Sequence, residues 1–257
     1  MNPRSGGSIL RDYCAPRMDD ALAILDLPSG GVSSIQEAIT LMTSISEALA
    51  PTDGLACFNR MYLIVTEKLL SEVSTGAFFG DPVFMSHLDV VFVNLYLAAV
   101  DDFQAQPPTA PRCWSELLAD RSDTHIAPMQ FALAGMSAHI NHDLPIAVVR
   151  TCQDLGTAPE QGTHAADFDK VNKVLGALDQ QIRESFETGV LLDLDRMAAG
   201  LENLVGNLAI DAARGTAWVN ALALWRLRHD SWLSKEYTDG LDVAAALAGR
   251  SLMEPLL

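Results

Sequence analysis

The segment from Asp81 to Asp102 most strongly limits what this 257-residue chain can fold into. It opens with Asp81 and Pro82, the arrangement of a helix N-cap followed by proline at the first helical position. The residues that follow are apolar on nearly every face of a helix, and such a helix is usually buried on every side. We therefore expect a central buried helix over residues 81–102.

Helical periodicity also dominates the rest of the chain, and alternation with a period of two is nearly absent. Ser34 with Glu37 forms a predicted capping box, and Asp53 is a predicted N-cap. Pro145 is expected to kink a helix or to start a new one. Further helices are expected over roughly 126–143, 168–188, 194–228 and 234–249. The sequence predicts an all-α fold, with a weakly patterned segment over 1–30 and a single-domain bundle of about eight to ten helices over 31–257.

Composition narrows the classes of partner. The formal net charge is −16, from 33 acidic and 17 basic residues, so the chain should repel phosphate backbones, and nucleic-acid binding is not expected. Four scattered cysteines and no recognisable signal peptide predict a cytoplasmic protein with reduced thiols. His87, Asp89 and Asn94 interrupt the longest apolar run, which favours a core helix over a membrane span. A homodimer is the default expectation for a helical enzyme of this size.

The candidate site begins with the segment QFALAGMSAHINHDLP, residues 130–145. It places His139, His142 and Asp143 on one side of a helix, with no charged residue before them. Ionisable groups in an apolar stretch need a hydrogen-bonding network, an ion or a substrate to compensate for lost water. The three residues are therefore predicted to be catalytic.

Other helices are predicted to add polar groups to the same pocket. His87, Asn94 and Asp101 are spaced seven apart and fall on one line of the 81–102 helix, whereas Asp89 lies on a different face. Converging polar groups inside a helical bundle are typical of a ligand pocket. We expect His87 and Asp101 to join the catalytic group, and seven residues to bind substrate: Asn59, Tyr62, Asn94, Asp89, Gln130, Ser137 and Asn141.

Each polar residue also has an ordinary structural interpretation. Asn94 or Asn59 alone is more often a helix–helix hydrogen bond than a substrate contact, and Tyr62 is more often a core residue with its hydroxyl at the rim. Asp143 could merely cap the segment that starts at Leu144. The combination of the 139–143 cluster with the His87 line is what favours function.

Three blocks of sequence resemble one family: PTDGLACFNRMYLIVTE (51–67), DPVFMSHLDVVFVNLYLAAVDD (81–102) and QFALAGMSAHINHDLP (130–145). It is a mostly actinobacterial, all-helical family catalogued only as a domain of unknown function, and VNKVLGALDQQIR and LAGRSL also fit it. The family commonly has Asn at the position of Ser137. This departure implies a different specificity if the side chain touches substrate. The resemblance strengthens the choice of residues and implies no reaction.

The residues leave three classes of function open. The favoured one is a small-molecule enzyme acting on a bulky apolar metabolite, polyketide-like or lipid-like, through histidine and carboxylate acid–base catalysis. Cyclisation (including spiroketal closure), dehydration and hydrolysis all suit such a pair. No cofactor is favoured, because no P-loop or dinucleotide fingerprint is present.

The second class is a metal-dependent helical hydrolase. His139 and Asp143 have the H-x-x-x-D spacing of zinc phospholipase C, so a single divalent ion, zinc or iron, could be held by them with His87. The chain has only six histidines, which argues against a trinuclear zinc site. The third class is a non-catalytic binding or interaction protein whose polar cluster organises the core.

Overall fold

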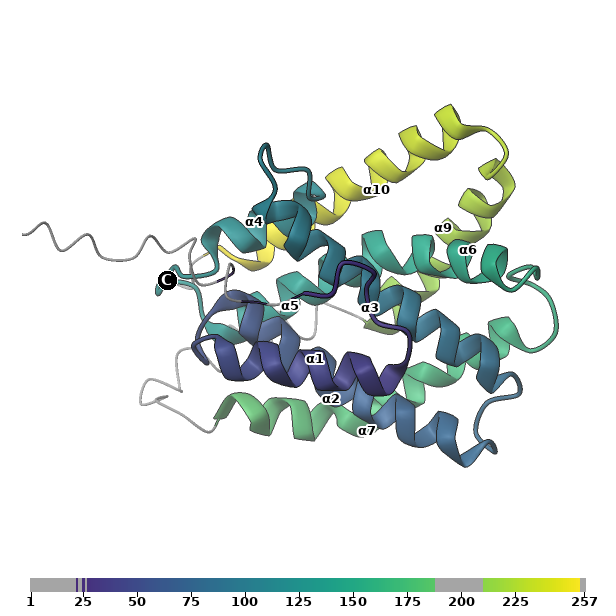
Figure 1. The fold of residues 1–257 in the computed structure, drawn as a ribbon, viewed down its shortest axis with the longest axis horizontal. Coiled ribbons are helices and arrows are strands. Elements are labelled where there is room, and N and C mark those ends of the chain that lie inside the picture. The colour runs from purple at the N-terminus through teal and green to yellow at the C-terminus, as the bar shows by residue number, and fades with distance from the viewer. Residues whose placement is uncertain (1–21, 23–24, 26, 188–209, 255–257) are drawn as a thin grey trace, which may run out of the picture.

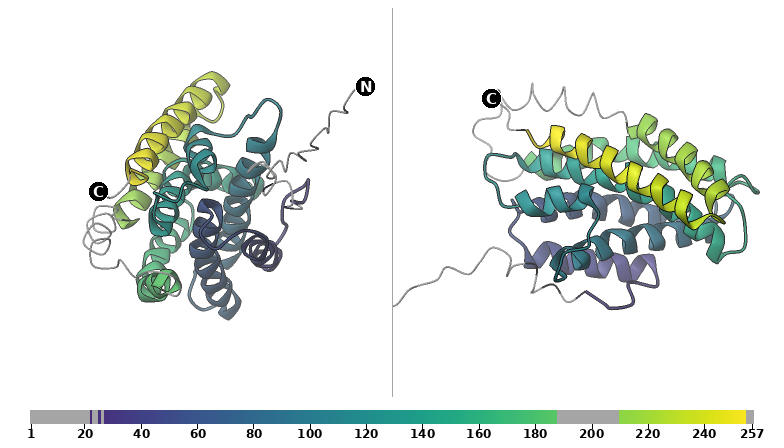
Figure 2. Two further views of the ribbon diagram at one scale, coloured as in Figure 1. Left: turned by 90° about the vertical axis from the view of Figure 1, so that its left-hand side faces the viewer. Right: turned by 90° about the horizontal axis from the view of Figure 1, so that it is seen from above.

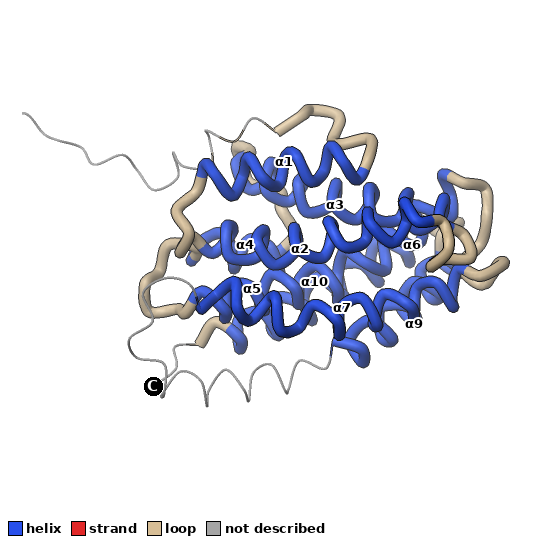
Figure 3. The backbone as a smooth tube through the Cα atoms, turned by 90° about the horizontal axis from the view of Figure 1, so that it is seen from below, coloured by secondary structure: helices blue, strands red, loops and turns tan. Residues whose placement is uncertain are grey.

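The computed structural model describes residues 22, 25, 27–187 and 210–254, and this part of the chain is helical, with no strand (Figures 1 and 3). The predicted all-α, single-domain bundle is confirmed for these residues. The helices in chain order are α1 (Ile35–Ala48), α2 (Gly54–Thr75), α3 (Pro82–Gln104), α4 (Arg112–Asp120), α5 (Pro128–Ala138), η2 (His139–Asp143), α6 (Leu144–Asp154), α7 (His164–Glu187), α9 (Ile210–Leu227) and α10 (Ser231–Leu252). Most of the 1–30 segment, and residues 194–209 of the helix expected over 194–228, lie outside the described residues.

Local capping chemistry sets the start of three helices. The side chains of Asp53 and Asp81 accept hydrogen bonds from Leu55 N and Phe84 N, and so cap α2 and α3 as the sequence predicts. Ser34 caps α1 by accepting from Glu37 N at 3.2 Å. The reciprocal half of the predicted capping box differs, because the Glu37 carboxylate accepts from the backbone N–H of Ser33 instead of that of Ser34.

The bundle has α1 on one side and α10 on the opposite side, with α2 and α5 between them (Figure 2). α2 packs against α1 and α5, and α5 packs in turn against α10. Every residue of α5 from Gln130 to Ala138 is buried. This stretch therefore runs through the centre of the described bundle and carries the chain directly into η2.

The long apolar helix α3 is less enclosed than its composition suggests. One face is buried, through residues such as Phe84, Asp89 and Tyr96, but Val83 is 66% exposed. By length and composition α3 is the one described helix that could cross a membrane, and half of its most apolar window lies inside the protein. A core helix passes the same test, so the absence of a membrane span stays a prediction. α5, instead of α3, is the helix enclosed on all sides.

A close approach of α2 and α5 fixes the centre of the bundle. Gly135 lies against the ring of Phe58, which is fully buried, and a Cβ at residue 135 would lie 2.5 Å from that ring. Such a contact is too short for a carbon atom, and the enclosed ring has no space into which it could move. Gly135 thus sets the spacing of the two helices directly before the predicted site.

We expect Gly135→Ala to lower the free energy of unfolding by about 1–3 kcal/mol, because the added methyl group overpacks the α2–α5 contact. Gly176→Ala is the matched control in α7, where a Cβ would meet nothing within 4 Å. It should raise stability by about 0.5–1 kcal/mol through helix propensity alone. Urea denaturation of both variants measures the difference, and equal effects would contradict this account of the packing.

Candidate active site

A single turn of π-helix, η2, separates α5 from α6. The backbone N–H of Leu144 donates to the carbonyl oxygen of His139, five residues back. Pro145 explains why a regular α-helix does not continue here, since proline has no N–H and its ring clashes with the carbonyl four residues earlier. π-turns of this kind occur frequently at functional sites. The helix predicted over 126–143 therefore consists of α5 followed by the wide turn η2, which contains the predicted catalytic residues, and α6 begins at Leu144, next to Pro145.

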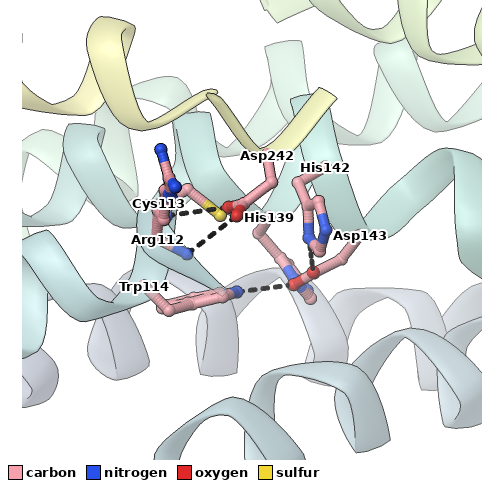
Figure 4. A network of polar contacts seen from close by, with 7 residues as sticks. All are labelled: Arg112, Cys113, Trp114, His139, His142, Asp143 and Asp242. Carbon is pink, nitrogen blue, oxygen red and sulfur yellow. Dashed lines mark hydrogen bonds and ion pairs between the residues drawn. The ribbon is translucent and has the colours of Figure 1, made fainter. Parts of the chain in front are cut away.

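Asp143 is the centre of a buried hydrogen-bonding network (Figure 4). Its Oδ2 accepts from Trp114 Nε1 at 2.9 Å and lies 2.8 Å from His139 Nδ1, while its Oδ1 lies 2.7 Å from His142 Nδ1. Burial alone would raise the pKa of Asp143, but hydrogen bonds from His139 and His142 outweigh it and lower the pKa. Asp143 is thus a carboxylate whose two oxygens both have donors.

The same carboxylate fixes the protonation of His139. Burial lowers the pKa of His139, and the opposing effect of Asp143 does not restore it, so the ring is neutral. A neutral ring that donates from Nδ1 to Asp143 has an unprotonated Nε2. Phe92 stacks on the ring at a centroid distance of 3.4 Å, and Tyr62 meets it edge-on at 4.6 Å. His139 is therefore a base held in one orientation.

His142 differs from His139 in charge. Burial would lower the pKa of His142, but the hydrogen bond and charge of Asp143, with the charge of Asp242, outweigh it and raise the pKa. Asp242 belongs to α10 and accepts from the backbone N–H groups of Arg112 and Cys113, each at 2.9 Å, at the start of α4. His142 thus lies between two carboxylates and retains its proton to higher pH than a free histidine.

A partly enclosed cavity adjoins His139. Its volume is about 50 Å³, which is enough for only a few water molecules. Its wall is made by side chains from α2, α3, α5, η2, α6, α7 and α9: Tyr62, Val65, Leu69, Met85, Leu88, Asp89, Phe92, Met136, His139, Ile140, Leu144, Val171, Leu175 and Arg214. Apolar side chains predominate, so the few polar groups in this wall have few hydrogen-bonding partners nearby.

Three of these wall residues carry buried polar atoms that form no hydrogen bond with the described residues: His139 Nε2, Tyr62 Oη and Asp89 Oδ2. The Thr66 hydroxyl is close to the Tyr62 side chain, but it donates its own hydrogen to the backbone oxygen of Tyr62, at 3.0 Å. Buried polar atoms without partners are rare because each loses its hydration. All three atoms belong to residues that line the same cavity.

Asp89 and Tyr62 carry O–H groups that can donate a proton or a hydrogen bond, whereas Nε2 of His139 can accept one. Burial raises the pKa of Asp89 to about 7, so a neutral carboxylic acid persists close to neutral pH. Burial, together with the charges of Asp89 and Asp143, raises the pKa of Tyr62, which therefore remains a phenol. The cavity wall combines one unprotonated nitrogen with two O–H donors.

The structure thus brings together His139, Asp143, Tyr62 and Asp89. His142 joins this group through its hydrogen bond with Oδ1 of Asp143. The structure does not bring His87 or Asp101 to this group. His87 Nε2 lies within hydrogen-bonding distance of Asp154 Oδ2, at 3.1 Å. The His87 side chain is 35% exposed, and Asp101 is exposed. The His87 line faces away from the cavity because Asp89, two residues further on, occupies the inward face of α3 with Phe92.

Four predicted substrate-binding residues hold helices or chain segments together instead. The Asn59 amide nitrogen donates to Met42 O and Ser46 Oγ, and Tyr96 donates to the Asn59 oxygen. Gln130 donates to the carbonyl oxygens of Leu252 and Glu254. Ser137 accepts from Asn141 at 3.1 Å.

Asn94 pairs with the backbone of Val32 in both directions, at 2.8 and 2.9 Å. Gly31, with a φ of +70°, brings the backbone so close to Asn94 that a Cβ would clash with its amide. Asn94, like the preceding four residues, forms hydrogen bonds within the protein, and none of the five lines the cavity.

Sequence reasoning missed four contributors: Phe92, Trp114, Arg214 and Asp242. Phe92 follows Asp89 by three residues, and that spacing could have placed it on the same helix face. Nothing in the sequence connects Trp114 or Asp242 with Asp143, since α4 and α10 reach it only through tertiary packing. Arg214 had a weak signal, being a charged residue within a largely apolar helix.

The geometry also bears on the metal hypothesis. Within 27–187 and 210–254, no group of three or more His, Cys, Asp or Glu residues is arranged to hold an ion. His87 is not near the other two residues proposed as ligands, and both oxygens of Asp143 are engaged by imidazoles. The expected set of His139, Asp143 and His87 therefore does not form a metal centre here.

The comparisons with known proteins concern the family. No curated protein and no solved structure matches the chain. A family model described as "Family of unknown function (DUF5995)" matches residues 35–255, which include every residue of the cavity wall and of the Asp143 network. The chain therefore belongs to DUF5995, a family of unknown function.

Proposed function

We propose that this protein is a small-molecule enzyme that uses His139 as a general base and Asp89 as a general acid on an apolar substrate. The proposal is carried by three buried polar atoms of residues that line one cavity, none of which forms a hydrogen bond with the described residues: His139 Nε2, Asp89 Oδ2 and Tyr62 Oη. Their environments move the pKa of the histidine down and the pKa of the carboxyl up. Titratable groups separated in this way are the usual source of acid and base roles in enzymes.

The roles follow from the protons that each group carries. His139 Nε2 removes a proton from a hydroxyl, a water molecule or an activated carbon of the substrate. The proton of Asp89 passes to the substrate oxygen that gains negative charge, and Tyr62 donates a hydrogen bond to the same oxygen. Asp143 and Trp114 are positioning residues that hold the imidazole in one tautomer. Cyclisation (including spiroketal closure), dehydration and hydrolysis all need this pair of proton transfers.

The apolar wall supports a polyketide-like or lipid-like substrate. Val65, Leu69 and Val171 surround the space beside the polar atoms and have no hydrogen-bonding groups to offer. Because its volume is only about 50 Å³, the cavity can hold the reacting part of a bulky molecule but not the whole molecule. Entry of the remainder requires neighbouring side chains to move, as occurs in many enzymes on substrate binding.

A non-catalytic core is the competing explanation, and stability discriminates between the two. If the polar atoms only organise the core, their removal should destabilise the protein by about 1–3 kcal/mol. If they wait for a ligand, their removal should stabilise it, because active sites carry unpaired groups at a cost in stability. Metal-dependent hydrolysis has no supporting observation among the described residues, where no three-ligand cluster occurs.

We expect His139→Ala and Asp89→Asn each to lower turnover by about 10²–10⁴-fold, the usual contribution of a general acid or base. His87→Ala is the matched control, because it removes a histidine that faces away from the cavity. The assay follows conversion of hydroxyketones, which can cyclise or dehydrate, and of medium-chain esters by mass spectrometry. Loss of turnover in His87→Ala, or no conversion of any of these substrates by the wild type, contradicts the proposal.

Turnover should fall as the pH rises through about 7, because Asp89 then loses the proton that it must donate. On the acid side it should fall only below the ordinary pKa of histidine, since burial lowers the pKa of His139. A profile that rises steadily between pH 6 and 9 would show that Asp89 is not the acid.

Asp89→Asn should stabilise the protein more at pH 8 than at pH 5. In the folded protein the pKa of Asp89 is about 7, whereas in the unfolded chain the carboxyl ionises near its ordinary value. Between these two pKa values, folding requires the Asp89 carboxyl to take up a proton, and the free-energy cost of this uptake grows as the pH rises. The Asn side chain does not ionise, so the variant avoids this cost. The stabilisation should differ by about 2–3 kcal/mol between the two pH values.

Urea denaturation at both pH values measures this difference. Asp101→Asn, an exposed change on the same helix, should shift stability by less than about 0.5 kcal/mol at either pH. Destabilisation by Asp89→Asn at pH 8 would favour the structural explanation of the cluster.

A further inference from the structure

A buried arginine forms part of the wall of the same cavity. Arg214 comes from α9, is 6% exposed, and lines the space together with His139 and Tyr62. α9 packs directly against η2, which brings the guanidinium and the Asp143 network to one region of the bundle. The catalytic roles proposed for His139, Asp89 and Tyr62 leave this charge without a purpose.

Among the described residues, uncharged groups hold the guanidinium in place. Nε donates to Asn172 Oδ1 at 2.7 Å and Nη2 donates to Phe168 O at 2.8 Å, while the group lies 4.3 Å over the centre of the Phe168 ring. All three partners are uncharged. No carboxylate forms an ion pair with Arg214, and Nη1 has no hydrogen bond, within the part of the chain that the structure describes.

Such an arrangement is costly for stability alone. Burial lowers the pKa of Arg214 to about 10, so the side chain still carries its charge at neutral pH. The two aspartates whose charges act on it, Asp169 and Asp211, are both exposed to water. A buried charge without a counter-ion is strongly destabilising, and buried charges in proteins are as a rule paired with an opposite charge or bound to an ion. No such partner of Arg214 occurs among the described residues.

We propose that Arg214 binds the carboxylate of the ligand, so that the molecule accepted by this cavity is an apolar monocarboxylic acid. A planar guanidinium matches a carboxylate in geometry and favours two parallel hydrogen bonds. One carboxylate balances one guanidinium, whereas a phosphate dianion would bring an uncompensated charge into an apolar wall. The hydrocarbon part of the acid then lies along Leu175 and Val171 toward His139.

This inference rests on the proposed function only in taking the cavity as the ligand site, since binding is measured without turnover. The probes are hexanoate, octanoate and decanoate, each compared with the alcohol and the primary amide of equal chain length. Isothermal titration calorimetry at pH 8 and low salt gives the affinities. We expect the best acid to bind the wild type at least about tenfold more tightly than its alcohol, as charge-assisted hydrogen bonds require.

Two variants assign the preference to Arg214. Arg214→Met should abolish the difference between acid and alcohol, while Arg214→Lys, which keeps the charge but loses the planar fork, should retain part of it. Arg226→Met is the matched control, since it removes an exposed charge from the same helix and should leave the preference intact. If Arg214→Met does not fold, the comparison of Arg214→Lys with Arg226→Met still decides.

Three results would overturn the inference: equal affinity of the wild type for acid and alcohol, no binding of any probe, or a preference that survives in Arg214→Met. The proposed function fails separately. Selective binding of acids without His139-dependent turnover leaves a carboxylate-binding protein, whereas turnover of uncharged substrates without this selectivity leaves an enzyme in which Arg214 has another role.

Discussion

The buried carboxylate of Asp143 is the group on which the rest of the site depends. An anion this far from water needs donors from several directions, and Trp114, His139 and His142 provide them. Because Trp114 belongs to α4 and the histidines to η2, satisfying this one charge draws two distant parts of the chain together. Asp242 extends the arrangement to α10 by placing a second negative charge near His142. The contacts that stabilise the buried Asp143 carboxylate are therefore also contacts that pack α4, η2 and α10 together.

Two ionisable groups in one apolar cavity end up with opposite tendencies. His139 and Asp89 are both deprived of water, and loss of water always disfavours the charged form of a group. For a histidine the neutral form is a base, and for a carboxyl the neutral form is an acid. Burial therefore favours the form of His139 that can accept a proton and the form of Asp89 that can donate one, without any interaction between the two groups. Asp143 adds the direction, because by occupying Nδ1 it leaves Nε2 of His139 as the basic atom.

Local signals in the sequence predicted the helix starts and the first cluster well. The hydrogen bonds of Asp53, of Asp81 and of the His139–Asp143 pair span only two to four residues, so they depend on the local sequence. The face of α3 that turns inward was beyond such signals. Because apolar residues surround α3, its sequence pattern does not indicate which side of the helix faces the core. Packing against α2, α6 and α7 determines that Asp89 faces inward and His87 outward. Trp114 and Asp242 entered through contacts between helices far apart in sequence, which no local pattern encodes.

The π-turn at η2 has a consequence for how this site could change over time. Each residue of a helix turns the chain by about 100°, so the extra residue of a π-turn offsets the helix after it from the helix before it. α5 can therefore keep its face toward α2 and α10, while α6 independently turns its own face toward α3 and α9. A lineage that lost one residue here would keep nearly all of its sequence and yet lose the alignment between these faces. The length of the chain at this point is as much a part of the site as the identity of its side chains.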